Sequence, residues 1–122
     1  MDLERIRAIC RKLPGTTHDL QWGDDLLFRI GGKIYATSCL NPAFPARLSF
    51  KCTPEEFAEL TERDGIVPAA YVARYKWVTL ERWDALSDQE IERLIRNSYQ
   101  LVRAKLPKKL TAKIALPRKG AS

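Results

Sequence analysis

Hydrophobic residues at the start of the chain recur at the spacing of one helical face. The repeat consists of Leu3, Ile6, Ile9, Cys10 and Leu13. Asp2 precedes it as a suitable N-cap, and Pro14-Gly15 follows it as a stop signal. The pattern predicts a helix over about residues 2–13.

The next forty residues change to the period-two alternation of β-strands. We expect a short extended piece at residues 19–22 and strands at 26–30, 33–39 and 48–52. Gly31-Gly32 predicts a two-residue hairpin, because glycine accepts the positive φ angles of a primed turn. Two prolines place residues 41–46 in a loop, since proline cannot donate to a central ladder.

Two capping boxes mark helix starts in the second half of the chain. Thr53-Pro54-Glu55-Glu56 opens one helix, which ends at Asp64-Gly65. Ser87-Asp88-Gln89-Glu90 opens a longer one, expected to run to Ala104 or Lys105 before Pro107. Between them, β-branched and aromatic residues predict a strand over about 76–82.

These elements give the order α-β-β-β-β-α-β-α and an α+β fold. Strands joined by short loops imply an antiparallel sheet packed by helices on one face. With 122 residues, we expect one domain over residues 1–106 and a loosely ordered basic tail over 107–122. The predicted core contains Phe28, Ile30, Leu48, Phe50, Trp77 and Leu94.

The charge is unevenly distributed. The net charge is +6, with 21 basic and 15 acidic residues, and residues 103–122 hold seven of the basic ones and no acid. The remaining 102 residues are therefore close to neutral. A basic tail is typical of contacts to phosphate backbones, and equally of a solubilising end without a partner.

Cysteine usage and hydropathy indicate a cytosolic protein. Cys10, Cys39 and Cys52 are odd in number and widely spaced, so we expect reduced and mostly buried thiols. No apolar run approaches the ~18 residues of a membrane span. The N-terminus is too charged for a secretory signal. We therefore expect a cytoplasmic location and no membrane partner.

No catalytic or metal-binding pattern is recognisable. His18 is the one histidine and has no nucleophile at a suitable spacing. Asp24-Asp25 fits a turn better than a cation site, and the acidic run from Glu55 to Asp64 fits a solvated helix face. Gly31-Gly32-Lys33 lacks the rest of a phosphate loop. We expect neither an enzyme nor a bound metal or cofactor.

The densest mixture of aromatics and cations lies between Tyr71 and Trp77. Arg74 and Lys76 suit contacts to phosphate, and aromatic rings suit stacking on bases. The same residues also fit a core strand with Arg74 packed over a ring. Tyr71, Tyr75 and Trp77 are candidates for lining a ligand pocket.

Five stretches together resemble the MmcQ/YjbR family of small bacterial proteins. They are residues 13–15, 28–36, 48–52, 68–78 and 98–102, and the likeness covers about residues 1–109. The resemblance implies a CyaY-like α/β fold with an antiparallel sheet, and the DNA-binding description that members of the family carry. It implies no catalytic residue. The first helix lacks the dense acidic residues that would suggest iron.

Two functional hypotheses follow. The first is weak, largely nonspecific DNA binding by a non-enzymatic protein. Its candidate residues are Arg47, Lys51, Arg74, Lys76, Lys108 and Lys109. The alternative is a protein-interaction or small-ligand module with a pocket near Tyr71 and Trp77, in which the basic tail has no role. A continuous basic strip would favour the first and an apolar pocket the second.

Overall fold

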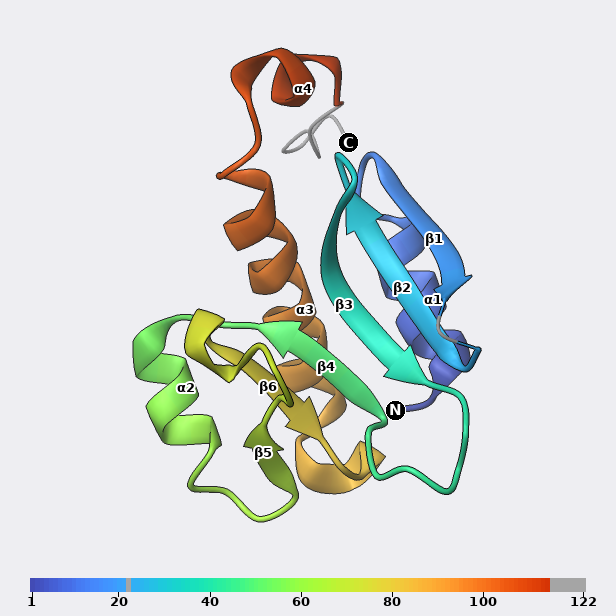
Figure 1. The fold of residues 1–122 in the computed structure, drawn as a ribbon, viewed down its shortest axis with the longest axis vertical. Helices are drawn as coiled ribbons and strands as arrows, with labels where there is room; N and C mark the ends of the chain where they lie inside the picture. The colour runs from blue at the N-terminus through green and yellow to red at the C-terminus, as the bar shows by residue number, and fades with distance from the viewer. Residues whose placement is uncertain (22, 115–122) are drawn as a thin grey trace.

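The computed structural model describes residues 1–21 and 23–114 and shows a mixed sheet-and-helix architecture (Figure 1). The helices are α1 (Leu3–Arg11), α2 (Pro54–Leu60), α3 (Asp88–Arg103) and α4 (Lys108–Lys113). The strands are β1 (Thr16–Gln21), β2 (Asp25–Ile30), β3 (Lys33–Cys39), β4 (Leu48–Lys51), β5 (Ile66–Pro68) and β6 (Trp77–Leu80). Short 3-10 turns occupy Ala73–Tyr75 and Trp83–Ala85.

The six strands form one sheet in the order β1-β2-β3-β4-β6-β5, and all pairs are antiparallel. The β2–β3 hairpin turns at Gly31 and Gly32, whose φ angles are 57° and 81°. Two successive positive φ angles are the requirement of a primed turn, so the glycine pair determines this hairpin. The predicted α+β class and antiparallel sheet are confirmed.

The predicted helix starts are also confirmed, because each N-cap side chain satisfies backbone N–H groups that have no partner within the helix. The Asp2 carboxylate accepts from the Arg5 amide at 2.9 Å. Thr53 with Glu56, and Ser87 with Glu90, form reciprocal capping boxes at the starts of α2 and α3.

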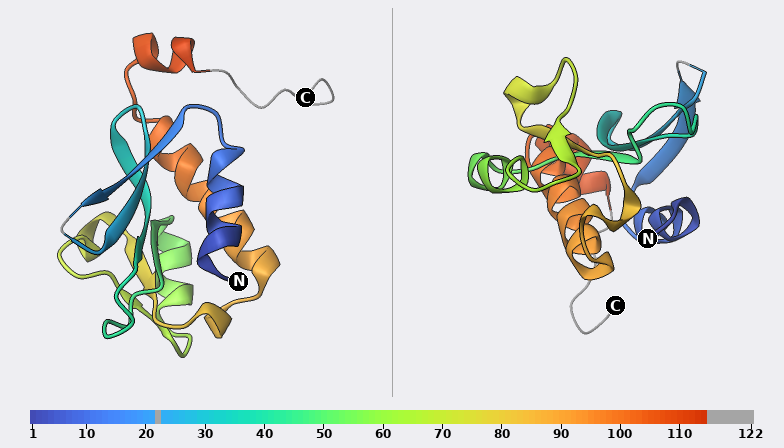
Figure 2. Two further views of the ribbon diagram at one scale, coloured as in Figure 1. Left: turned by 90° about the vertical axis from the view of Figure 1, so that its right-hand side faces the viewer. Right: turned by 90° about the horizontal axis from the view of Figure 1, so that it is seen from below.

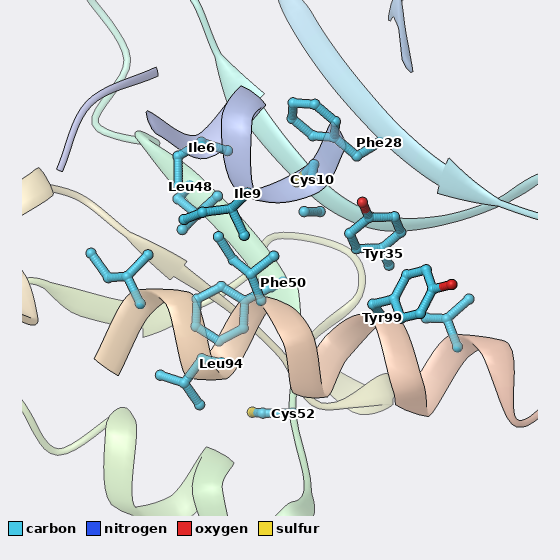
Figure 3. Packing of buried hydrophobic residues seen from close by; sticks show 14 of the residues in the cluster. Ile6, Ile9, Cys10, Phe28, Tyr35, Leu48, Phe50, Cys52, Leu94 and Tyr99 are labelled. Carbon is cyan, nitrogen blue, oxygen red and sulfur yellow. The ribbon is translucent and has the colours of Figure 1, made fainter. Parts of the chain in front are cut away.

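The hydrophobic core lies between one face of the sheet and helices α1 and α3, which pack on the same side (Figure 2). Phe28, Phe50 and Leu94 are fully or almost fully buried there, as predicted (Figure 3). Two tyrosines are buried as well, and the rings of Tyr35 and Tyr99 meet edge to face at 5.4 Å. Their hydroxyls bond to Thr16 and to the Pro14 carbonyl, which offsets the cost of burying them.

Strands β3 and β4 share only a short ladder, through the pairs Ala36–Phe50 and Thr37–Ser49, and then diverge (Figure 1). The side chain of Ser98 on α3 occupies the point of divergence. Its hydroxyl donates to the Tyr35 carbonyl at 2.6 Å and accepts from the Lys51 amide at 3.0 Å. One buried hydroxyl therefore replaces the missing ladder bonds between the two strands.

Two details of the sheet differ from the sequence-based expectations. Strand β5 was not predicted, because a segment of three residues that ends in a proline carries almost no strand signal. Trp77 was expected in the core, and this is wrong: it is only half-buried and pairs with Lys51 in the register of β4 and β6. Its neighbour Val78 faces the core instead, so strand alternation turns the indole to the opposite face.

Part of the basic tail is helical. Helix α4 lies within it, and the half-buried Ile114 packs against the core beside Gly15. Leu110 is exposed, whereas Leu116, Arg118 and Lys119 lie outside the described residues, as does Trp22 in the predicted extended piece.

Replacing Ser98 by alanine should lower the free energy of unfolding by about 1–3 kcal/mol, because it leaves a buried carbonyl and a buried amide without partners. Urea denaturation followed by far-UV circular dichroism measures this loss. Thr17→Ala, which removes an exposed hydroxyl on β1, is the control and should change stability by less than about 0.5 kcal/mol. Equal midpoints for the two variants would refute the bridging role of Ser98.

Candidate binding groove on the open face of the sheet

The face of the sheet opposite α1 and α3 carries a row of mostly small side chains. The register places Leu27, Thr37, Ser49, Thr79 and Val67 side by side across five strands. The Ser49 and Thr79 hydroxyls bond to each other at 2.7 Å. Small, mutually bonded side chains leave space above the middle of this face.

That space forms a groove of about 770 Å³, here called the sheet groove. Its floor consists of Ile34, Thr37, Ser49, Trp77 and Thr79. Its sides are Asp24, Asp25, Cys39, Phe44, Ala46, Ala69, Ala70, Tyr71 and Val72. The volume is in the range of ligand-binding clefts, and most of the lining is apolar, which is typical of such sites.

Two connecting segments build the walls, and both project from the open face of the sheet (Figure 2). The first is the β3–β4 loop, which carries Phe44 and Ala46 into the groove. The Arg47 guanidinium holds this loop by donating to the carbonyls of Asn41 and Phe44. Phe44 remains 57% exposed, so its ring is available at the rim.

The second wall is the segment from Ala69 to Lys76, anchored at both ends. The Ala69 amide bonds to the Trp77 carbonyl at 3.0 Å, and the Lys51 ammonium donates to the Tyr75 carbonyl at 2.6 Å. Tyr71 and Lys76 have φ angles of 67° and 66°. Positive φ is unusual for residues with side chains and marks a tightly constrained segment. The Tyr71 side chain is 100% exposed above the groove.

The structure brings two of the three pocket candidates together. Tyr71 and Trp77 both line the sheet groove, whereas Tyr75 does not. The Arg74 guanidinium lies 4.8 Å from the centre of the Tyr75 ring. Tyr75 is thus stacked with a cation outside the groove.

The nucleic-acid candidates on the sheet are all engaged within the protein. Arg47 holds the β3–β4 loop, and Lys51 bonds to the Tyr75 carbonyl. Burial, and then the nearby Lys105 ammonium, lower the pKa of Lys51. The Lys76 ammonium lies 5.1 Å over the Phe57 ring. Together with the contact of Arg74 to the Tyr75 ring, these contacts give all four of these cations structural roles near the groove walls.

Lys108 and Lys109 lie apart from this group. Both are exposed on α4, at the end of the molecule that follows α3 (Figure 1). Within the described ranges neither takes part in an ion pair. The six candidate cations therefore belong to two separate regions.

The cysteines are free, and two of them are buried as expected. Burial raises the pKa of the Cys10 and Cys52 thiols to about 11. Cys39 differs, because it is half-buried and lines the sheet groove. Its thiol lies 3.8 Å from the Asn41 carbonyl.

Sequence patterns alone missed most of the groove. Phe44 was assigned only to a loop, and Ile34, Thr37 and Ser49 to strands without a function. The sequence signal that could have found the strand residues is the occurrence of small and polar side chains at alternate strand positions, which indicates that one face of the sheet is uncovered. Among residues 1–21 and 23–114 no group of three or more possible ligands is placed to hold a metal ion.

The sequence matches the YjbR family model over residues 11–101. The chain belongs to the YjbR family. Its fold is similar to the crystal structure of protein DR2400 of Deinococcus radiodurans, a DUF419 protein, with 27% identity and a TM-score of 0.84. That likeness covers 99% of this chain and 94% of the other.

A crystal structure of a Pseudomonas syringae protein is also similar to this YjbR protein. The identity is 27% and the TM-score 0.68, over 83% of this chain and 98% of that one. No curated protein matches the chain. In the part of the chain that the structure describes, no helix has the length and apolar character to cross a membrane.

We expect Cys39 to react with a thiol reagent such as DTNB faster than the other two cysteines. At pH 8 the raised pKa values keep Cys10 and Cys52 protonated, and burial blocks access to them. A native titration should show one fast thiol, and Cys39→Ser should remove that phase. Persistence of the fast phase in Cys39→Ser would contradict the exposure assigned to Cys39.

Proposed function

We propose that this YjbR protein is a non-enzymatic binding module, and that its sheet groove binds an extended apolar segment of a partner protein. The observation that carries the proposal is the groove itself, an apolar channel of about 770 Å³ on the uncovered face of the sheet. Exposed apolar surface bordered by polar residues is typical of interaction sites.

The aromatic residues of the groove support a protein partner. Phe44 and Tyr71 lie at its sides and Trp77 in its floor, and large aromatic side chains are enriched among the residues that dominate binding energy at protein interfaces. The floor is held rigidly by the sheet, and the walls are fixed by the bonds of Arg47 and Lys51. A preformed site of this kind binds with a small loss of conformational entropy.

The chemistry of the groove supports binding rather than catalysis. Cys39 is the one thiol in its lining, and the hydrogen bond of this thiol goes to the Asn41 carbonyl, although Asp25 is its cross-strand partner in the register. His18 lies on β1, outside the lining residues. An activated thiol is typically hydrogen-bonded to its base, and among the described residues Cys39 bonds instead to a backbone carbonyl.

Peptides selected on the full chain from a random heptapeptide display library should depend on the groove. Phe44→Ala and Trp77→Ala should each weaken their binding at least about tenfold, because each removes an aromatic contact. Fluorescence anisotropy with synthetic labelled peptides measures the dissociation constants. Leu20→Ala is the control, since Leu20 is 58% exposed on β1 and lies outside the groove lining.

If no peptide is enriched, or if all enriched peptides bind Phe44→Ala and Trp77→Ala as tightly as the unmodified protein, the proposed function is refuted. Circular dichroism of each variant establishes that the fold is retained.

A second candidate function is weak contact with nucleic acid through the C-terminal cations. The exposure of Lys105, Lys108, Lys109 and Lys113 favours it, since exposed cations on a protein surface can contact phosphates without forming a pocket. The sheet groove lies elsewhere and does not contribute. Arg74 and Lys76 would add at most a small contribution, because both already stack on aromatic rings.

If this second function exists, neutralising Lys108 and Lys109 should weaken duplex DNA binding and reduce its salt dependence. Lys108→Gln/Lys109→Gln should make the slope of log K against log salt shallower by about 2, whereas Arg74→Ala and Lys76→Ala should change it by about one unit or less each. These substitutions leave Ile114 in place, unlike removal of residues 107–122. Absence of binding by the full chain at low salt would refute nucleic-acid contact.

A further inference from the structure

Two adjacent carboxylates lie at one end of the sheet groove. Asp25 is the first residue of β2 and half-buried, and Asp24 is exposed in the turn before it. Both line the groove. The Asn41 amide lies 3.4 Å from Asp24, a long contact that leaves the charge uncompensated. Within residues 1–21 and 23–114, neither aspartate is in an ion pair within 4.0 Å.

The nearby cations on this face of the sheet are engaged elsewhere. Arg29 bonds to Asp19 at 3.1 Å and to the Gly32 carbonyl. Arg47 donates to two carbonyls of the β3–β4 loop. The other twelve lining residues carry no charge. The groove thus combines an apolar body with a negatively charged end.

We propose that the segment bound in the sheet groove carries a lysine or arginine side chain at the Asp24–Asp25 end, next to apolar residues that contact Trp77 and Phe44. This inference rests on the proposed function. The reason is charge complementarity, since a carboxylate pair beside an apolar channel favours a cation and disfavours acidic segments. An arginine fits best, because its planar group donates several bonds to carboxylates at once.

A side-chain cation fits this end better than a bare metal ion. Hard divalent cations take six or more oxygen ligands, of which two adjacent carboxylates supply only a part. A guanidinium or ammonium group on a peptide segment bound in the groove needs no acceptors other than the Asp24 and Asp25 carboxylates. The apolar channel supplies the remaining contact area.

The test uses peptides from the display selection on the full chain, with parallel selections on Asp24→Asn/Asp25→Asn and on Glu55→Gln/Glu59→Gln. The second variant is the matched control, because it neutralises two exposed carboxylates on α2 away from the groove. Peptides selected on the full chain and on the control should share an apolar residue and a basic residue at a fixed spacing. Peptides selected on the Asp24→Asn/Asp25→Asn variant should keep the apolar residue and lack only the basic one.

In solution, the selected basic peptide should bind the Asp24→Asn/Asp25→Asn variant at least about tenfold more weakly than it binds the unmodified protein. Replacing its basic residue by norleucine should cause the same loss on the full chain and almost none on the variant, as expected for two partners of one contact.

The outcomes separate the two proposals. Peptides that depend on Phe44 and Trp77 but bind equally well with and without the two aspartates would overturn the cationic end and leave the groove function standing. Peptides that depend on neither set would overturn the proposed function as well. An equal loss with Glu55→Gln/Glu59→Gln would assign the effect to overall charge and also overturn the proposal.

Discussion

The buried hydroxyl of Ser98 bridges the two halves of the sheet at the point where strands β3 and β4 diverge. Strands β1, β2 and β3 form one half and β4, β6 and β5 the other, joined by two residue pairs. Where β3 and β4 part, Ser98 bridges the Tyr35 carbonyl and the Lys51 amide. Helix α3 therefore continues the connection between the two halves beyond the ladder, whose Thr37–Ser49 pair lies in the floor of the sheet groove.

The groove exists because both long helices cover the same face. Helices α1 and α3 bury the inner face of the sheet, and the β3–β4 loop and the segment before β6 rise from the other face (Figure 2). Leu27 is 0% exposed although it faces away from the main core, so part of this face is also covered. The open face is thus a shaped surface with fixed walls rather than a flat sheet.

The electrostatic contacts divide the molecule into regions with different potential partners. Cations near the groove hold its walls, as Arg47 and Lys51 do, and the charge left inside is the Asp24–Asp25 pair. The exposed cations of α4 lie at a separate end of the molecule (Figure 1). Net charge alone would merge these regions, although one is an apolar groove with a negative end and the other an exposed cluster of lysines.

The sequence by itself determined the local elements and the family. The Gly31-Gly32 turn and the capping boxes at Thr53 and Ser87 depend on residues a few positions apart, so local patterns predicted them. The short strand β5 escaped prediction because it is a strand only through its pairing with β6.

Only the tertiary structure decided which face of each strand is covered. Trp77 has the large apolar side chain of a typical core residue. The register with β4 nevertheless places it in the groove and places Val78 in the core. Alternation shows that two neighbours face opposite sides, but not which side receives the helices. Asp24, Phe44 and Trp77 line one groove because the helices cover the other face of the sheet. The three residues come from segments that only the folded sheet brings together.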